Sequence, residues 1–205
     1  MYFKKMIDIP SLPIDLKDDL VAEAIKVFNT KQHELLVYPD KRFELENVNC
    51  LNYIKKEEME FYEKSGGVSV LAMSDRMRTR TVTFFKKVDH PATNIFNDYV
   101  YLFVQGGSFC APHIDDVSRR REGLQLLLKA GGDAVKTIWY EPKEQFKELP
   151  IIDYCCIPYS KINSVSETSL EENYWYWMKF DSIHSIENLH SLRIFLVGIK
   201  NNALM

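Results

Sequence analysis

The sequence predicts a mainly β fold, an antiparallel sandwich or barrel, with helices near the N-terminus packed on it. From about residue 68 onward, short segments rich in β-branched and aromatic residues alternate with glycine, proline, asparagine and aspartate, as in strands joined by tight turns. Before that point, apolar residues recur at helical spacing. Aromatic residues make up 13% of the chain, which also favours strands.

Two helices are expected in the N-terminal region. Over residues 15–29 the apolar residues fall on one helical face, and Asp15 suits the N-cap. A second helix is expected over residues 53–64, ended by Gly66 and Gly67. Between the two helices, residues 35–38 are expected to form a short strand that stops at Pro39.

The rest of the chain is expected to be a series of strands. They are residues 79–85, 99–104, 123–128, 135–140, 151–157, 174–180 and 192–199. Residues 130–133 predict a hairpin between two of them, and the polar residues 160–173 predict a loop. We expect one domain over residues 1–205, in which residues 1–90 support a core of residues 91–205.

Composition narrows the class of protein. The chain has 205 residues, 46% hydrophobic and 27% charged, enough for a sizeable core. Its net charge of −3 predicts no strongly basic surface, so nucleic acid is not the expected partner. Apolar runs such as residues 194–199 are too short to span a bilayer, and the N-terminus is no signal peptide, so a cytoplasmic location without a membrane partner is expected. The oligomeric state is left open.

The cysteines fit the same location. Cys50, Cys110, Cys155 and Cys156 contain no Cys-x-x-Cys pair, and we expect all four to be reduced thiols.

His113 and Asp115 are the first candidate functional residues. They lie two apart, so on a strand both side chains share a face and can reach one ion. In a chain with five histidines such a pair is weak by itself, and a surface histidine beside a solvated carboxylate is the alternative.

A second group lies near the end of the chain. His184 is followed nine residues later by Arg193, which opens a strongly apolar strand. A buried arginine needs an anionic partner, for which a bidentate carboxylate is suited. Two imidazoles and one carboxylate form a facial triad that leaves coordination positions open. His190 is a rival for the second histidine, but it lies only three residues before Arg193.

Residues 99–199 resemble the 2-oxoglutarate/Fe(II) oxygenase superfamily. The superfamily motif is His-x-Asp followed downstream by His and then, about one strand later, by Arg. It matches His113, Asp115, His184 and Arg193. The resemblance is greatest to the aspartyl/asparaginyl β-hydroxylase-like branch, through the run 112–115, the arginines 119–121 and the pair 139–140.

This resemblance implies a double-stranded β-helix, a cupin-like jelly roll of two sheets. It implies that His113, Asp115 and His184 bind Fe(II). It also implies that 2-oxoglutarate binds that iron as co-substrate, with its far carboxylate on Arg193, and that dioxygen is consumed as a C–H bond is hydroxylated. The implied substrate is an amino-acid side chain in a peptide or protein, with a small free metabolite as the alternative.

Further residues are candidates for contacts with the co-substrate or the substrate, and only Arg121 among them rests on the resemblance. Arg121 is expected to touch the co-substrate, although the run of arginines 119–121 also fits a solvated turn. Tyr101 and Gln125 are expected to line the pocket, or else to be plain sheet residues. Arg76, Arg78 and Arg80 alternate along an expected strand, so they share one face, which is either solvated or binds an acidic substrate.

Two other classes of protein are alternatives. A cupin-type metal protein without a co-substrate usually carries a His-x-His pair, which this chain lacks. A jelly-roll binding module with an inert metal motif would be favoured by a missing Asp115 or Arg193, and both residues are present.

Overall fold

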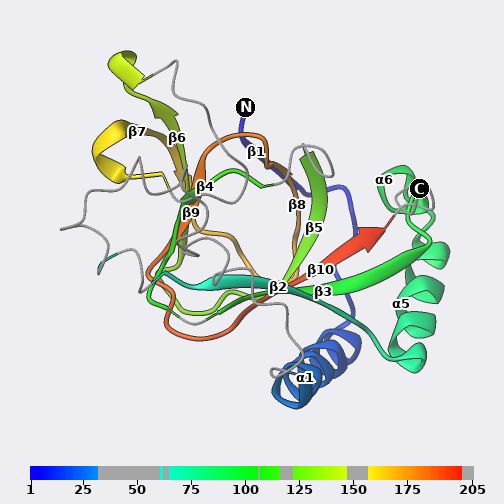
Figure 1. Cartoon of the computed structure of the whole chain (residues 1–205). Helices are drawn as coiled ribbons and strands as arrows, with labels where there is room; N and C mark the ends of the chain where they lie inside the picture. The colour runs from blue at the N-terminus through cyan, green and yellow to red at the C-terminus, as the bar shows by residue number, and fades with distance from the viewer. Residues whose placement is uncertain (32–60, 62–64, 106, 116–121, 147–156, 200–205) are drawn as a thin grey trace, which may run out of the picture.

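The computed structural model describes residues 1–31, 61, 65–105, 107–115, 122–146 and 157–199. Two antiparallel β-sheets face one another, and helices lie beside the larger sheet (Figure 1). The helical elements are α1 (Ile14–Lys31), α5 (Asp75–Val88), α6 (Pro91–Asn94) and the short 3-10 turns η1 (Glu144–Phe146) and η2 (Tyr159–Lys161). The strands are β1 (Phe3–Met6), β2 (Gly67–Ala72), β3 (Asp98–Gln105), β4 (Cys110–His113), β5 (Glu122–Lys129), β6 (Lys136–Pro142), β7 (Ile162–Thr168), β8 (Trp175–Lys179), β9 (His184–Glu187) and β10 (Arg193–Ile199).

The strand order is that of a jelly roll. The larger sheet runs β1-β8-β5-β10-β3-β2 and the smaller sheet β4-β9-β6-β7. From β3 to β10 the chain passes back and forth between the sheets, so the four strands β8-β5-β10-β3 face the four strands of the smaller sheet. This arrangement is a double-stranded β-helix, and the predicted mainly β class is confirmed.

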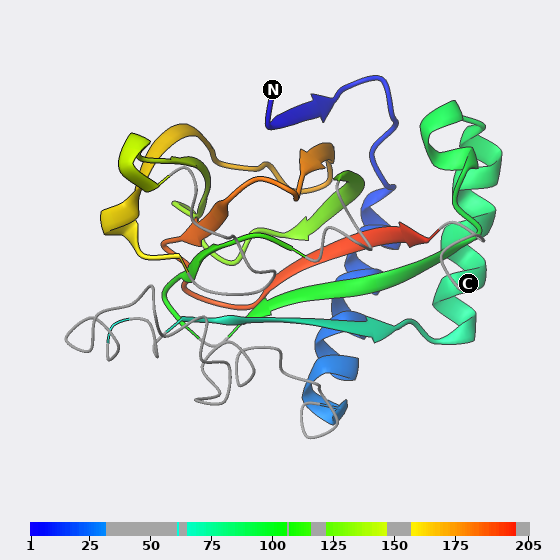
Figure 2. The ribbon, with the colours of Figure 1, turned by 45° about the horizontal axis from the view of Figure 1, so that its top comes forward.

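The helices cover the face of the larger sheet that points away from the smaller one (Figures 1 and 2). Leu16, Leu20, Ala24 and Phe28 recur every four residues, so α1 buries a continuous apolar stripe. The side chains that meet it from β3 are Tyr99, Tyr101 and Phe103, which alternate along the strand. The predicted helix over residues 15–29 is confirmed, although Asp15 lies in its first turn, after the first helical residue.

A second core fills the space between the two sheets. Its residues come from the opposite faces of the same strands, because neighbouring side chains on a strand point to opposite sides. They include Val104, Leu127, Trp139, Met178, Ile186 and Phe195. A third apolar cluster, which includes Ile138, Tyr140 and Ile183, lies on the outer face of the smaller sheet.

The strand predicted over residues 79–85 is wrong, because these residues lie in helix α5. Ser74 caps the helix by accepting a hydrogen bond from the Met77 amide, and Asp89 ends it at φ 50°. Met77, Thr81 and Phe85 recur every four residues and are buried, and this burial outweighs the β propensity of the threonines and Val82.

The shared strand face predicted for Arg76, Arg78 and Arg80 is also wrong, because these residues lie in the same helix. Arg78 lies near Asp75 and Asp98, and Arg80 pairs with Asp19 of α1, all at the surface.

Two connections also differ from expectation. Residues 130–133 were predicted to close a hairpin, but β5 lies in the larger sheet and β6 in the smaller, so this turn carries the chain between sheets. Residues 160–173 were predicted to be a loop, yet β7 (Ile162–Thr168) pairs with β6 along its whole length. Strands predicted over 99–104, 123–128, 135–140, 174–180 and 192–199 are confirmed as β3, β5, β6, β8 and β10.

Other predictions fall largely or wholly outside the described residues. These are the helix over 53–64, the strands over 35–38 and 151–157, and the thiols Cys50, Cys155 and Cys156. Cys110 is buried, and its Sγ lies 3.9 Å from His113 Nδ1. Within the described part of the chain, the helices are too short or too polar to cross a membrane.

Candidate metal centre

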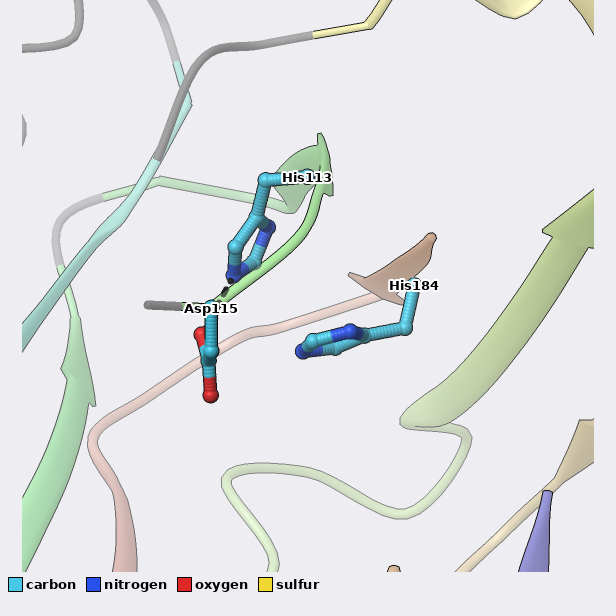
Figure 3. A group of neighbouring side chains, drawn as sticks. All are labelled: His113, Asp115 and His184. Carbon is cyan, nitrogen blue, oxygen red and sulfur yellow. Dashed lines mark ion pairs between the residues drawn. The ribbon is translucent and has the colours of Figure 1, made fainter. Parts of the chain in front are cut away.

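Two neighbouring strands of the smaller sheet bring the histidines together. His113 ends β4 and His184 begins β9, and the two are paired directly across these antiparallel strands. Asp115 follows two residues later, where its backbone amide donates a hydrogen bond of 3.2 Å to the Phe180 carbonyl. Figure 3 shows the three side chains pointing toward one another.

The three side chains are spaced as ligands of one ion. One ligand atom from each of His113, Asp115 and His184 lies within 4.8 Å of the other two. His113 Nε2 is 3.4 Å from Asp115 Oδ1, and the two imidazole centroids are 4.6 Å apart. The histidines are 2% and 8% exposed, whereas the Asp115 side chain is 23% exposed, so the group lies between the protein interior and solvent.

Backbone carbonyls orient both imidazoles. His113 Nδ1 lies 2.7 Å from the Ala111 carbonyl and His184 Nδ1 lies 2.9 Å from the Ser182 carbonyl. A carbonyl only accepts, so each Nδ1 carries a proton, and Nε2 is the ring nitrogen on each histidine that is left to bind a metal. Two imidazoles and one carboxylate are the donor set typical of non-haem Fe(II) sites, so these residues fit that ion.

Arg193 lies on the facing sheet and reaches between the two sheets. It is 1% exposed, and its Nη2 donates to Thr137 Oγ1 of β6 over 3.3 Å. Its guanidinium carbon is 4.9 Å from the Phe195 ring centroid. Its Nε and Nη1 have no hydrogen-bond partner within the described residues.

This guanidinium is a buried cation that lacks a counter-ion among the described residues. Burial lowers the pKa of Arg193 to about 9, so the side chain is still charged at neutral pH. Two unpaired N–H groups on a buried cation form a site for an anion, and a carboxylate matches that geometry.

The anion site and the metal group lie a short distance apart. Along β6, Thr137 pairs with Ile186 of β9, and Trp139 pairs with His184. The residue that contacts Arg193 is therefore two positions, roughly 7 Å, along the strand from the residue opposite the metal ligand. A small dicarboxylate is long enough to reach from one site to the other.

The remaining predicted site residues have different outcomes. The pocket role predicted for Tyr101 is wrong: it lies on the helix-covered face of β3, and its hydroxyl donates to Glu23 of α1 over 2.6 Å. Gln125 is buried, and its amide lies 2.7 Å from Met178 Sδ in the core between the sheets. Arg121 lies outside the described residues. The rival ligand His190 is exposed and lies beside Gly132, apart from the metal group.

Three residues near the site were not predicted to belong to it. Thr137 contacts Arg193, Trp139 is paired with His184, and the Phe180 ring lies 6.0 Å from the His184 ring. The period of two along β6 placed Thr137 and Trp139 on one face, but the sequence did not say which face is internal.

Comparisons with known proteins give likenesses in structure alone. No protein-family model and no curated protein matches the chain. Among solved structures, a Pseudomonas putida prolyl-4-hydroxylase is 13% identical with a TM-score of 0.48, covering 96% of this chain and 90% of that one.

Two further structures match a smaller part of themselves. The Escherichia coli ribosomal oxygenase YcfD in complex with cobalt and 2-oxoglutarate is 15% identical with a TM-score of 0.37, covering 68% of this chain and 34% of that one. Bacillus subtilis oxalate decarboxylase is 12% identical with a TM-score of 0.31, covering 67% and 26%. What this chain binds and converts is therefore inferred from its own side chains.

Proposed function

We propose that this chain is a 2-oxoglutarate- and Fe(II)-dependent dioxygenase that hydroxylates a C–H bond. The observation that carries this proposal is a buried guanidinium with two N–H groups that have no partner among the described residues. It faces a group of two histidines and one aspartate across the same jelly-roll interior. A metal group alone fits several classes of protein. The added anion site points to a co-substrate that is both a metal chelator and a carboxylate.

His113, Asp115 and His184 would hold the metal through two Nε2 atoms and one carboxylate oxygen. A ferrous ion there would supply dioxygen chemistry and a chelation site for a keto-acid. The Ala111 and Ser182 carbonyls would keep the two imidazoles in the tautomer that binds metal. Because these contacts are made by backbone next to the ligands, the group is organised before any metal arrives.

Arg193 and Thr137 would hold the far carboxylate of 2-oxoglutarate. The guanidinium offers Nε and Nη1, and the Thr137 hydroxyl can turn to donate as well as accept. Burial between the sheets excludes water and strengthens this pairing. Gln125 and Arg121 remain candidates for further co-substrate contacts.

The proposed substrate is an amino-acid side chain in a peptide or protein, with a small free metabolite as the alternative. Asp115 is the most exposed member of the metal group, so the substrate would approach from its side. None of the structures named above is an aspartyl/asparaginyl hydroxylase, and the reaction class does not depend on that branch. We further propose that residues 1–205 act as one domain, with residues 1–90 supporting the core.

The direct test is Fe(II)-dependent conversion of 2-oxoglutarate to succinate. Asp115→Ala is expected to lose stoichiometric iron, measured by equilibrium dialysis, because it removes the only carboxylate of the group. Asp181→Ala is the matched control: this carboxylate lies close along the chain and near Lys179, outside the metal group. Full iron occupancy in Asp115→Ala would remove Asp115 from the ligand set, and no succinate from the iron-loaded parent would refute the reaction class.

A further inference from the structure

Trp139 is the largest buried side chain beside the candidate metal centre. It is 1% exposed and lies in the core between the two sheets. In the antiparallel pair of β6 and β9 it is directly opposite His184, so the two side chains share a face with their Cβ atoms about 4.5–5.5 Å apart. An easily oxidised indole therefore adjoins a proposed ligand of an oxidising metal.

The N-terminal segment stacks on this indole. The Phe3 ring lies 5.1 Å from the Trp139 ring at an interplanar angle of 12°, and the Tyr2 ring lies 6.3 Å away at 28°. The indole Nε1 donates to the Lys179 carbonyl over 3.3 Å, and the Lys179 amide donates to the Tyr2 carbonyl over 2.9 Å. Strand β8 thus fixes Trp139 and Tyr2 relative to each other, with their π-systems in near contact.

Tyr2 carries a proton acceptor on its hydroxyl. Its phenol donates to Glu141 Oε1 over 2.6 Å, and this pair is at the protein surface. A phenol that loses an electron becomes a strong acid, so its oxidation is easy only where a base can take the proton. Glu141 is such a base, two residues beyond Trp139 on β6.

We propose that Trp139 and Tyr2 form an electron-transfer path that carries oxidising equivalents from the metal centre to the protein surface. The oxidant, derived from dioxygen or peroxide, rests on the proposed function. It takes one electron from Trp139, and the Tyr2 phenol returns one electron to the indole and passes its proton to Glu141. A thiol in solution then restores the Tyr2 phenol by giving up one hydrogen atom and becomes a thiyl radical, and Glu141 releases its proton to solvent. The path protects His113 and His184 when oxygen is consumed without substrate.

The test loads the full chain with Fe(II) and adds hydrogen peroxide in the absence of 2-oxoglutarate. Peroxide supplies the oxidant directly, so a chain that binds iron but never makes succinate still tests the path. Electron paramagnetic resonance and peptide mass spectrometry then locate the oxidation. In the parent protein we expect a tyrosyl radical, with Tyr2 carrying most of the modification.

Tyr2→Phe keeps the stacked ring but removes the phenol. It is expected to abolish the tyrosyl radical signal and to raise oxygen incorporation at Trp139 several-fold. Glu141→Gln keeps an acceptor oxygen but not the base, and is expected to act in the same direction more weakly. Tyr174→Phe, a tyrosine under Lys5, is the control and should change neither readout.

A purely structural stack predicts a different result. Unchanged oxidation sites in Tyr2→Phe, with iron bound and peroxide consumed, would overturn the path and leave the proposed function standing. A chain that binds no iron would overturn both.

Discussion

Replacing Arg193 by methionine is expected to stabilise the protein while removing its response to 2-oxoglutarate. Arg193 is buried between the sheets with one hydrogen bond, to Thr137, and two N–H groups without partners in the described residues. Methionine fills a similar volume without charge. The fold therefore loses an uncompensated buried cation, and the proposed co-substrate loses its counter-charge.

The size of the effect follows from the burial of the cation. The pKa of Arg193 falls from 12.5 to about 9. At ~1.4 kcal/mol per pKa unit, this fall corresponds to about 5 kcal/mol of lost hydration. The hydrogen bond to Thr137 and the contact with the Phe195 ring offset roughly half of that penalty. Arg193→Met should thus gain about 1–3 kcal/mol, or ~2–4 °C in melting temperature per kcal/mol for a chain of this size.

The loss of ligand response is larger. Removing one partner of a buried charge pair costs about 2–5 kcal/mol, which weakens binding by roughly 30-fold to a few thousand-fold. The parent protein at a 2-oxoglutarate concentration of 100 times Kd gains about 2.7 kcal/mol of stability. At the same concentration the variant should gain less than about 1 kcal/mol.

The assay is thermal melting with Mn(II) in the metal site, since Mn(II) prefers similar oxygen and nitrogen ligands and prevents turnover. Each protein is melted with and without 2-oxoglutarate. Arg80→Met is the control, because that guanidinium pairs with Asp19 at the surface, and it should change stability by less than ~1 kcal/mol and keep the ligand response. An Arg193→Met protein that is less stable than the parent and still responds to 2-oxoglutarate would show that Arg193 is structural.

Three more predictions concern the scaffold, and denaturant or thermal melts check each. Asn173 has φ 65° and exchanges two hydrogen bonds with the Leu12 backbone. Both variants lose these bonds, but alanine is also strained at positive φ, so Asn173→Ala should lose about 1–2 kcal/mol more stability than Asn173→Gly. Equal losses of stability would contradict this. Gly198→Ala would place a methyl group against the Cγ edge of the Phe96 ring and should cost about 1–3 kcal/mol. Phe96→Ala removes that Cγ, so Gly198→Ala should cost less in the Phe96→Ala background than in the parent. An equal cost in both backgrounds would exclude this collision as the cause. Leu127 is buried in the core between the sheets, so Leu127→Ala should lower stability by about 2–5 kcal/mol. It should also weaken the 2-oxoglutarate response more than it weakens iron binding. A larger loss of iron binding would contradict a site divided between the two sheets.

Local sequence periodicity correctly predicted helix α1 and several of the strands. Helix α1 follows from apolar residues at helical spacing, and β3 and β10 follow from dense runs of β-branched and aromatic residues. His113 and Asp115 were predicted as ligands because a strand places alternate residues on one face, but β4 ends at His113 and Asp115 lies beyond it. His184 and Arg193 were predicted as site residues from the type and order of residues that the resembling family shares.

Where the predictions from sequence were wrong, tertiary contacts determine the structure. Helix α5 carries threonines and Val82, which favour strands. Its buried residues Met77, Thr81 and Phe85 are four apart in the sequence, a spacing that indicates a helix. The turn at residues 130–133 resembles a hairpin, but β5 pairs with β8 and β10, which lie far along the chain. Tyr101 was assigned to the pocket because alternation along β3 does not say which face is internal.

The candidate site is divided between the two sheets, and this division explains why its parts should fail separately. The two histidines of the metal group come from β4 and β9 of the smaller sheet and Asp115 from the segment after β4, whereas Arg193 belongs to the larger sheet. The distance between metal and anion site is therefore set by the packing of the core between the sheets, at a spacing of roughly 10 Å. A change in that core should shift Arg193 relative to Thr137 and weaken co-substrate binding first. Metal binding should persist until the smaller sheet itself loses its order.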